Sequence, residues 1–204
     1  MGALRQLFGP SRESIWRQLS ERIGGRYIES SFWKNPRVEA SHREWLITLD
    51  TYAVHTGKVT IVYTRMRAPY VNPDGFRFTI YRRGLFSGLA TWFGMQDLEV
   101  GVEPFDHDFV IKGTDEARLR QLFSNARIRE LLSLQPEIHF TVKDDEGWFG
   151  TTFPEGVDEL YFQVSGVIKD VDRLKLLYDL FAETLDELCR MGSAYESAAD
   201  VTLT

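Results

Sequence analysis

Hydrophobic residues recur along this chain with two different periods. Three runs show the spacing of an amphipathic helix: 15–23, 119–132 and 174–188. Three others show the apolar–polar alternation of strands: 26–83, 138–143 and 160–164. The pattern predicts an α+β fold in which a curved, mostly antiparallel sheet carries helices packed on one face, including a long C-terminal helix. This layout is analogous to helix-grip and TATA-binding-protein-like architectures.

Two turn signals divide the first alternating region. Thr56-Gly57-Lys58 separates a strand around 45–49 from the strand that follows it. Asn72-Pro73-Asp74-Gly75 is the strongest turn signal in the chain, because Asp-Gly favours the positive φ that a reversal needs. The region is therefore predicted to be an antiparallel meander of at least three strands. Residues 98–111 are predicted to add one or two strands more.

One segment of the chain occurs twice. Val110-Ile111-Lys112 leads through Asp115 into an amphipathic helix, and Val167-Ile168-Lys169 leads through Asp170 into another. Each copy predicts a strand, an acidic cap and a helix, so the second half is expected to stack its helices on a shared sheet. The apolar stripe of the first of these helices shifts near Ser124-Asn125, which predicts a break there.

The predicted organisation is a single domain with two extensions. Residues 1–10 form an N-terminal arm, and 11–192 form one α+β domain that contains the repeated strand–helix unit. Residues 193–204 consist mainly of Ser, Ala, Asp and Thr and bury little, so they are predicted to be a disordered tail.

Composition narrows the classes of partner. The 204-residue chain has a formal net charge of −6, so its overall field attracts neither nucleic acid nor anionic membrane. Arg65 and Arg67 share a strand face with tyrosines, as in a phosphate-binding surface, but an exposed arginine face that is partly paired with Asp50 or Glu44 is the favoured explanation in an acidic chain. Cys189 is the single cysteine, and no apolar run is long enough to span a membrane. We therefore expect a cytoplasmic protein without a membrane span.

Motifs for catalysis are missing from the sequence, so no catalytic residue and no cofactor are predicted, and a non-catalytic protein is favoured over an enzyme. Asp106, His107 and Asp108 are the best metal candidates, since Asp106 and Asp108 would share a strand face; a solvated strand edge is the alternative. His139 lies on the polar side of its predicted strand and is expected at the surface.

Aromatic pairs beside glycine-bearing loops are the least usual feature. Trp92-Phe93 and Trp148-Phe149, with Phe153, mark an interaction surface if they are exposed; alternatively they close the core. A second candidate site is an apolar cavity between the sheet and the C-terminal helix. Its candidate wall residues, which plain core packing also explains, are Phe78, Phe140, Leu177 and Phe181.

A short pattern gives the chain one resemblance. Phe105-Asp106-x-x-Phe109-x-Ile111, followed by Asp115 and a Leu-rich helix, resembles a bacterial family of domains of unknown function that commonly follow an N-terminal membrane anchor. The likeness covers 76–132 and implies a bacterial source. The leading hypothesis is a non-catalytic module that binds a protein partner, or itself, through the aromatic loops. The alternatives are a protein that binds a small apolar ligand and a metal-dependent hydrolase.

Overall fold

The structure, a computed structural model, describes residues 10–30, 35–84, 97–144, 153–199, 201 and 203. The helices are α1 (Arg12–Arg22), α2 (Glu103–Asp108), α3 (Glu116–Ser124), α4 (Ala126–Ser133) and α5 (Val171–Arg190). The strands are β1 (Arg26–Ile28), β2 (Arg37–His42), β3 (Trp45–Thr56), β4 (Val59–Val71), β5 (Phe78–Arg82), β6 (Phe109–Gly113), β7 (His139–Lys143) and β8 (Val157–Ser165).

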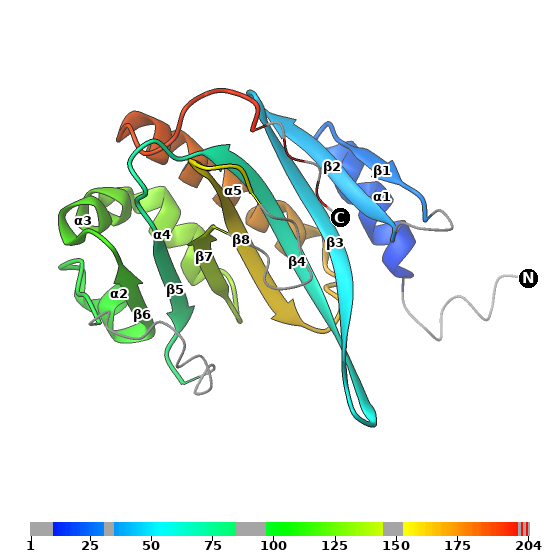
Figure 1. Cartoon of the computed structure of the whole chain (residues 1–204). Helices are drawn as coiled ribbons and strands as arrows, with labels where there is room; N and C mark the ends of the chain where they lie inside the picture. Colours follow the sequence, from blue (N-terminus) through cyan, green and yellow to red (C-terminus); the bar gives the residue numbers. More distant parts are fainter. Residues whose placement is uncertain are drawn as a thin grey trace, which may run out of the picture.

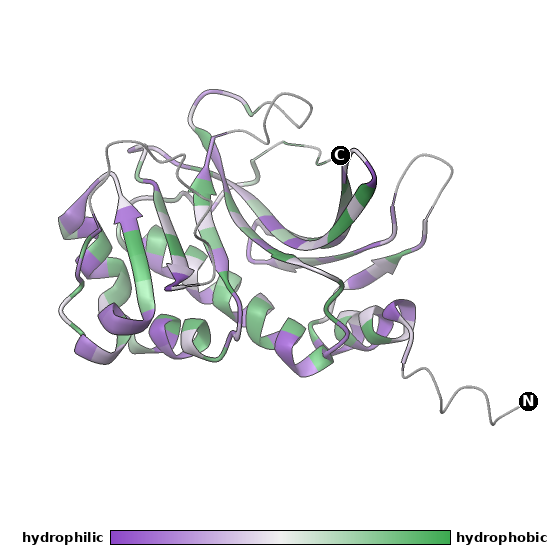
Figure 2. Cartoon of the chain, turned by 90° about the horizontal axis from the view of Figure 1, so that it is seen from below, coloured by the Kyte–Doolittle hydropathy of each residue, from purple (hydrophilic) through white to green (hydrophobic). Residues whose placement is uncertain are grey.

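The strands form one antiparallel sheet in the order β1-β2-β3-β4-β8-β7-β5-β6 (Figure 1). The sheet is curved, and α1, α3, α4 and α5 lie on one of its faces (Figure 2). The predicted α+β fold with helices on one face is therefore confirmed, including the long C-terminal helix α5.

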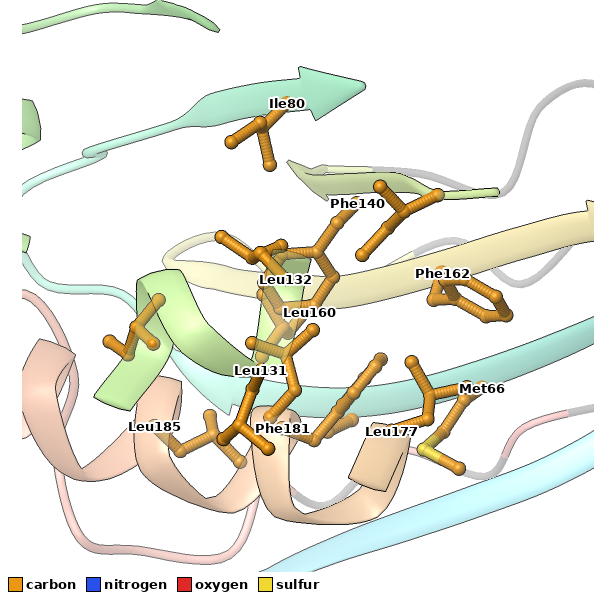
Figure 3. Close-up of a cluster of buried hydrophobic side chains, with 14 of the residues drawn as sticks. Met66, Ile80, Leu131, Leu132, Phe140, Leu160, Phe162, Leu177, Phe181 and Leu185 are labelled. Carbon is orange, nitrogen blue, oxygen red and sulfur yellow. The ribbon is translucent and has the colours of Figure 1, made fainter. Parts of the chain in front are cut away.

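The core lies between the sheet and these helices. Alternate residues of each strand point towards it, and they meet the apolar stripe of α5 and the short helix α4 (Figure 3). The ring of Phe140 on β7 packs edge-on against Phe181 of α5, with 5.3 Å between ring centroids. Since 3.6 residues make a helical turn, the spacing of Leu174, Leu177, Phe181 and Leu185 places all four on this buried side.

Helix ends follow local sequence signals. The Ser11 side chain accepts from the Ser14 N–H and so caps the start of α1. Asn125 ends α3 and begins α4, where its Oδ1 accepts from the backbone N–H of Arg127 and Ile128. The break predicted at Ser124-Asn125 is confirmed, because one asparagine side chain satisfies the first amides of a new helix.

The predicted meander is correct as far as β4 and then fails. Gly57 adopts a φ of +61° in the turn between β3 and β4, which pair directly. The turn at 72–75 also forms, with Gly75 at a φ of +67°, but β5 does not pair with β4. Strands β8 and β7, from the C-terminal half, lie between them. Local alternation cannot reveal such an insertion, because the inserted strands come from a distant part of the chain, beyond α2, α3 and α4.

Three other predictions need correction. Residues 103–108 form helix α2 instead of a strand, and β6 begins only at Phe109. In the second repeat copy the strand ends at Ser165, so 167–169 lie beyond it, although Asp170 caps α5 as expected. The tail is packed at its beginning, since Ser193 is buried and the Trp45 Nε1 donates to the Tyr195 carbonyl at 3.1 Å. The predicted arm lies, apart from Pro10, outside the described residues.

Candidate functional site on the outer face of the sheet

The four residues proposed as cavity walls lie together in the core. Phe78, Phe140, Leu177 and Phe181 are all fully buried. Phe78 and Phe140 pack edge to face with 5.8 Å between ring centroids, and Phe140 contacts Phe181 in the same manner. Figure 3 shows the surrounding side chains pointing towards one another from β-strands, α4 and α5. These contacts are those of a packed core.

The three residues proposed as metal ligands have other partners. Both oxygens of the Asp106 carboxylate accept backbone N–H groups, from Val100, Gly101 and Val102, each at 2.9 Å. His107 is exposed and contacts Asp108 at 3.1 Å. Asp106 and Asp108 lie on helix α2, so the expected shared strand face does not exist. Within the described part of the chain, no three Asp, Glu, His or Cys side chains converge as a metal site.

The aromatic pairs Trp92-Phe93 and Trp148-Phe149 lie outside the described residues, so their role in binding stays a prediction. Phe153, the fifth residue of that proposal, is described and is buried, with 8% of its surface exposed.

The sheet face away from the helices, which we call the outer face, carries a layer of polar side chains instead of a solvated surface. This polar layer consists of Thr48, Asp50, Arg65, Arg67, Thr79, His139, Thr141, Lys143, Glu159, Tyr161 and Gln163. Most of its members are buried, Arg67 and Glu159 almost completely. Burying so many polar groups is costly unless they bond to one another.

Asp50 is the centre of the first group in the polar layer. Its Oδ1 accepts from Arg65 Nε at 2.6 Å, and its Oδ2 accepts from Arg65 Nη2 at 3.1 Å and Arg67 Nη2 at 2.6 Å. Arg65 lies directly across from Asp50 in the β3–β4 register. The predicted pairing of these arginines with Asp50 is thereby confirmed, and it neutralises charge that would otherwise be buried alone. The exposed arginine face predicted with it is wrong, since Arg67 is 1% exposed.

Hydrogen bonds continue the layer towards β8 and β7. The hydroxyls of Tyr52 and Tyr161 both donate to Gln163 Oε1, at 2.7 and 2.9 Å. Lys143 Nζ lies 3.3 Å from the centroid of the Tyr161 ring and 3.8 Å from the Glu159 carboxylate. Burial raises the pKa of both tyrosines, so their hydroxyls remain protonated donors.

His139 is buried in this layer, contrary to the surface position predicted for it. Its Nε2 lies 3.3 Å from the Thr79 hydroxyl. Burial, helped by the charge of Lys143, lowers the pKa of His139 to about 4, so the imidazole is neutral near pH 7. Alternation identified the polar side of β7 correctly, but polarity alone does not reveal whether a sheet face is covered.

Hairpin β3–β4 extends past the strands on both sides of it (Figure 1). The pairing of β2 with β3 ends at Leu49, and the pairing of β8 with β4 ends at Thr64. Residues 52–63, which we call the projecting hairpin, are therefore a two-stranded ribbon among the described residues, apart from a single bridge between Tyr63 and Gly166 at its base. At its base the rings of Tyr52 and Tyr63 stack with 5.2 Å between centroids, and the Arg65 guanidinium covers Tyr52.

Apolar side chains of the projecting hairpin are exposed. The exposed fractions are 39% for Val54, 57% for Val59, 37% for Ile61 and 36% for Val62. Val54 and Ile61 are paired across the two strands, on the same face as Tyr52 and Tyr63. Residues 51–64 contain no carboxylate, and their ionisable side chains besides the tyrosines are His55 and Lys58. The sequence contained this signal, but exposure could be known only from where the neighbouring strands end.

No protein-family model matches this chain, and no curated protein matches it. The bacterial resemblance of 76–132 therefore stays a prediction. A similar solved structure is the crystal structure of the mycobacterial trehalose monomycolate transport factor A, TtfA. The two share 10% identity with a TM-score of 0.49, over 87% of this chain and 94% of that one. A likeness of this strength carries no argument about function. None of the described helices is both long enough and apolar enough to cross a membrane.

Proposed function

We propose that this chain is a non-catalytic module that binds a protein partner, and that the projecting hairpin is its docking surface. The observation that carries the proposal is the exposure of Val54, Val59 and Ile61 on a ribbon that no described strand flanks. Isolated exposed apolar residues are ordinary, but paired ones on a projecting strand edge favour association.

The base of the hairpin supports a docking role. The Tyr52–Tyr63 stack, the Arg65 guanidinium and the hydrogen bond from Tyr52 to Gln163 fix the ribbon to the polar layer. An already ordered surface loses little conformational freedom on binding, so more of the contact energy is retained as affinity.

The absence of a recognised catalytic motif in the sequence supports the non-catalytic part of the proposal. The geometry of the other two candidate sites, the apolar cavity and the metal site, also favours the hairpin as the binding surface. The proposed cavity residues pack against each other, and the Asp106 carboxylate is already bonded to three amides. Docking through the aromatic loops is compatible with the proposal, as a second contact region on the same partner.

The test places the photo-crosslinking residue p-benzoylphenylalanine at Ile61 in cells of the source organism. The matched control carries it at Leu134, which is apolar and 50% exposed but lies at the end of α4. We expect discrete covalent adducts from position 61 and none of comparable yield from position 134. Equal yields at the two positions, or no adduct at 61, would refute docking through the hairpin.

A further inference from the structure

The tip of the projecting hairpin carries a positive charge in a chain that is negative as a whole. Lys58 lies in the turn between β3 and β4 and is exposed. Residues 51–64 contain no carboxylate, whereas the whole chain has a formal net charge of −6. Within the described part of the chain, the Lys58 side chain has no ion pair, whereas Lys112, Lys143 and Lys175 each face a carboxylate.

An apolar row leads directly to this charge. Three cross-strand pairs follow one another on one face of the hairpin: Tyr52–Tyr63, Val54–Ile61 and Thr56–Val59. Lys58 is next to the last of these pairs, at the tip. At the other end of the row, the Arg65 guanidinium is already neutralised by Asp50. A partner that covers the row therefore meets one unmatched charge, that of Lys58.

The length of the hairpin separates this charge from the rest of the molecule. Lys58 lies about 20 Å along the strand from Thr64, where the pairing of β8 with β4 ends. The screening length at physiological ionic strength is about 8 Å. A partner at the tip is therefore attracted by Lys58 without being repelled strongly by the negative charge of the main body.

We propose that the partner of the hairpin is a different protein, whose docking surface is an apolar patch bordered by carboxylates, one of which pairs with Lys58. The inference rests on the proposed function, because it states the chemistry of the partner at the same surface. Two copies of the hairpin do not complement each other, since they would bring together two cations and no carboxylate. An anionic membrane is also disfavoured, because binding to it takes a cluster of basic residues, and 51–64 supplies a single lysine.

Charge reversal at the tip tests this inference. The chain carries p-benzoylphenylalanine at Ile61, in cells of the source organism, with Lys58 changed to Arg, Gln or Glu. Because a surface ion pair contributes a small free energy, we expect Lys58→Gln to lower the adduct yield about two- to fivefold, and Lys58→Glu to lower it further. Lys58→Arg keeps the charge and should keep the yield. The matched control is Lys169→Glu, which reverses another exposed lysine, outside the hairpin, and should leave the yield unchanged.

The outcomes distinguish this inference from the proposed function. Equal yields with arginine and glutamate at position 58 would overturn the acidic partner and leave docking through the hairpin in place. Absence of any adduct from position 61 would refute docking itself. An adduct with twice the mass of the chain, or with the mass of a lipid, would overturn the inference, because neither is the partner that it names.

A zero-length crosslink detects the ion pair directly. A carbodiimide forms an amide between a lysine amine and a carboxylate that are in contact. In an extract of the same cells, it should couple the chain to the protein found by photo-crosslinking, and peptide mapping should locate the amide at Lys58. Lys58→Arg should keep the photo-adduct and lose this amide, because the guanidinium stays protonated and is not acylated. Amides found only at other lysines would overturn the inference.

Discussion

Replacing Asp50 with Asn should destabilise the fold far more than removing the charge of a more exposed ion pair. The substitution keeps the shape of the side chain but removes the negative charge that faces Arg65 and Arg67. Arg67 is 1% exposed, so water cannot replace the lost partner. A charged guanidinium would then remain buried without its nearest opposite charge.

The magnitude follows from the bonds to Asp50. Three charge-assisted hydrogen bonds end on this carboxylate, at 2.6, 3.1 and 2.6 Å. Bonds of this kind contribute about 1.5–3 kcal/mol each, but they are not additive, and the Arg65 side chain retains some exposure. Breaking one side of a buried pair typically costs about 3–5 kcal/mol, and we expect a loss in that range.

Equilibrium unfolding in urea at pH 7 measures the loss. The matched control is Asp179→Asn, which removes the carboxylate of the more exposed pair between Lys175 and Asp179 on α5. That change is expected to cost less than about 1 kcal/mol. If Asp50→Asn and the control lower the free energy of unfolding by the same amount, the reasoning about buried charge in this layer is refuted.

Three further predictions concern His139, Phe181 and Asn125. Between pH 7 and 5 the protein should lose about 2 kcal/mol more than its His139→Gln variant does, because the unfolded imidazole takes up a proton while the folded one, with a pKa of about 4, stays neutral. Urea unfolding at both pH values measures this, and parallel pH dependence would contradict it. Phe181→Ala should cost about 3–5 kcal/mol by leaving a cavity beside Phe140, and a loss below 1 kcal/mol in thermal unfolding would indicate a space that is not tightly packed. Asn125→Ala should cost about 1–2 kcal/mol and speed amide exchange at the start of α4, whereas Ser124→Ala should leave that exchange unchanged.

Features of the fold that depend on neighbouring residues could be predicted from the sequence. Ser11, Asn125 and Asp170 lie at helix starts because their side chains bond amides two or three positions ahead. The turn at Gly57 is equally local. The apolar stripe of α5 is visible in the sequence because helical geometry converts its spacing directly into one buried face.

Features that depend on distant pairing could not be predicted. Nothing near β4 or β5 indicates that β8 and β7 will lie between them. His139 was expected at the surface because alternation separates two faces of a strand without showing what covers each one. In 103–108 the same alternation was assigned to a strand, although Pro104 at the beginning of the segment suits the first turn of a helix.

For the projecting hairpin, too, the sequence predicts the local features but not those that depend on distant strands. The run of β-branched and aromatic residues from 51 to 64, free of carboxylates, is legible in the sequence. Its exposure is not, because it arises from β2 and β8 ending their pairing before the hairpin does. The pairing of Asp50 with the two arginines was predictable, since the register of a hairpin is determined by its turn.

The most direct test of docking through the hairpin is hydroxyl-radical labelling of the dilute purified chain and of the same chain inside cells. In the purified chain, Val54, Val59 and Ile61 should be labelled in proportion to their exposure. Inside cells we expect labelling of these three residues to fall severalfold, while Leu134 keeps its labelling. Unchanged labelling of the hairpin in cells would contradict the account, because a docking surface in use cannot remain as accessible as one that is vacant.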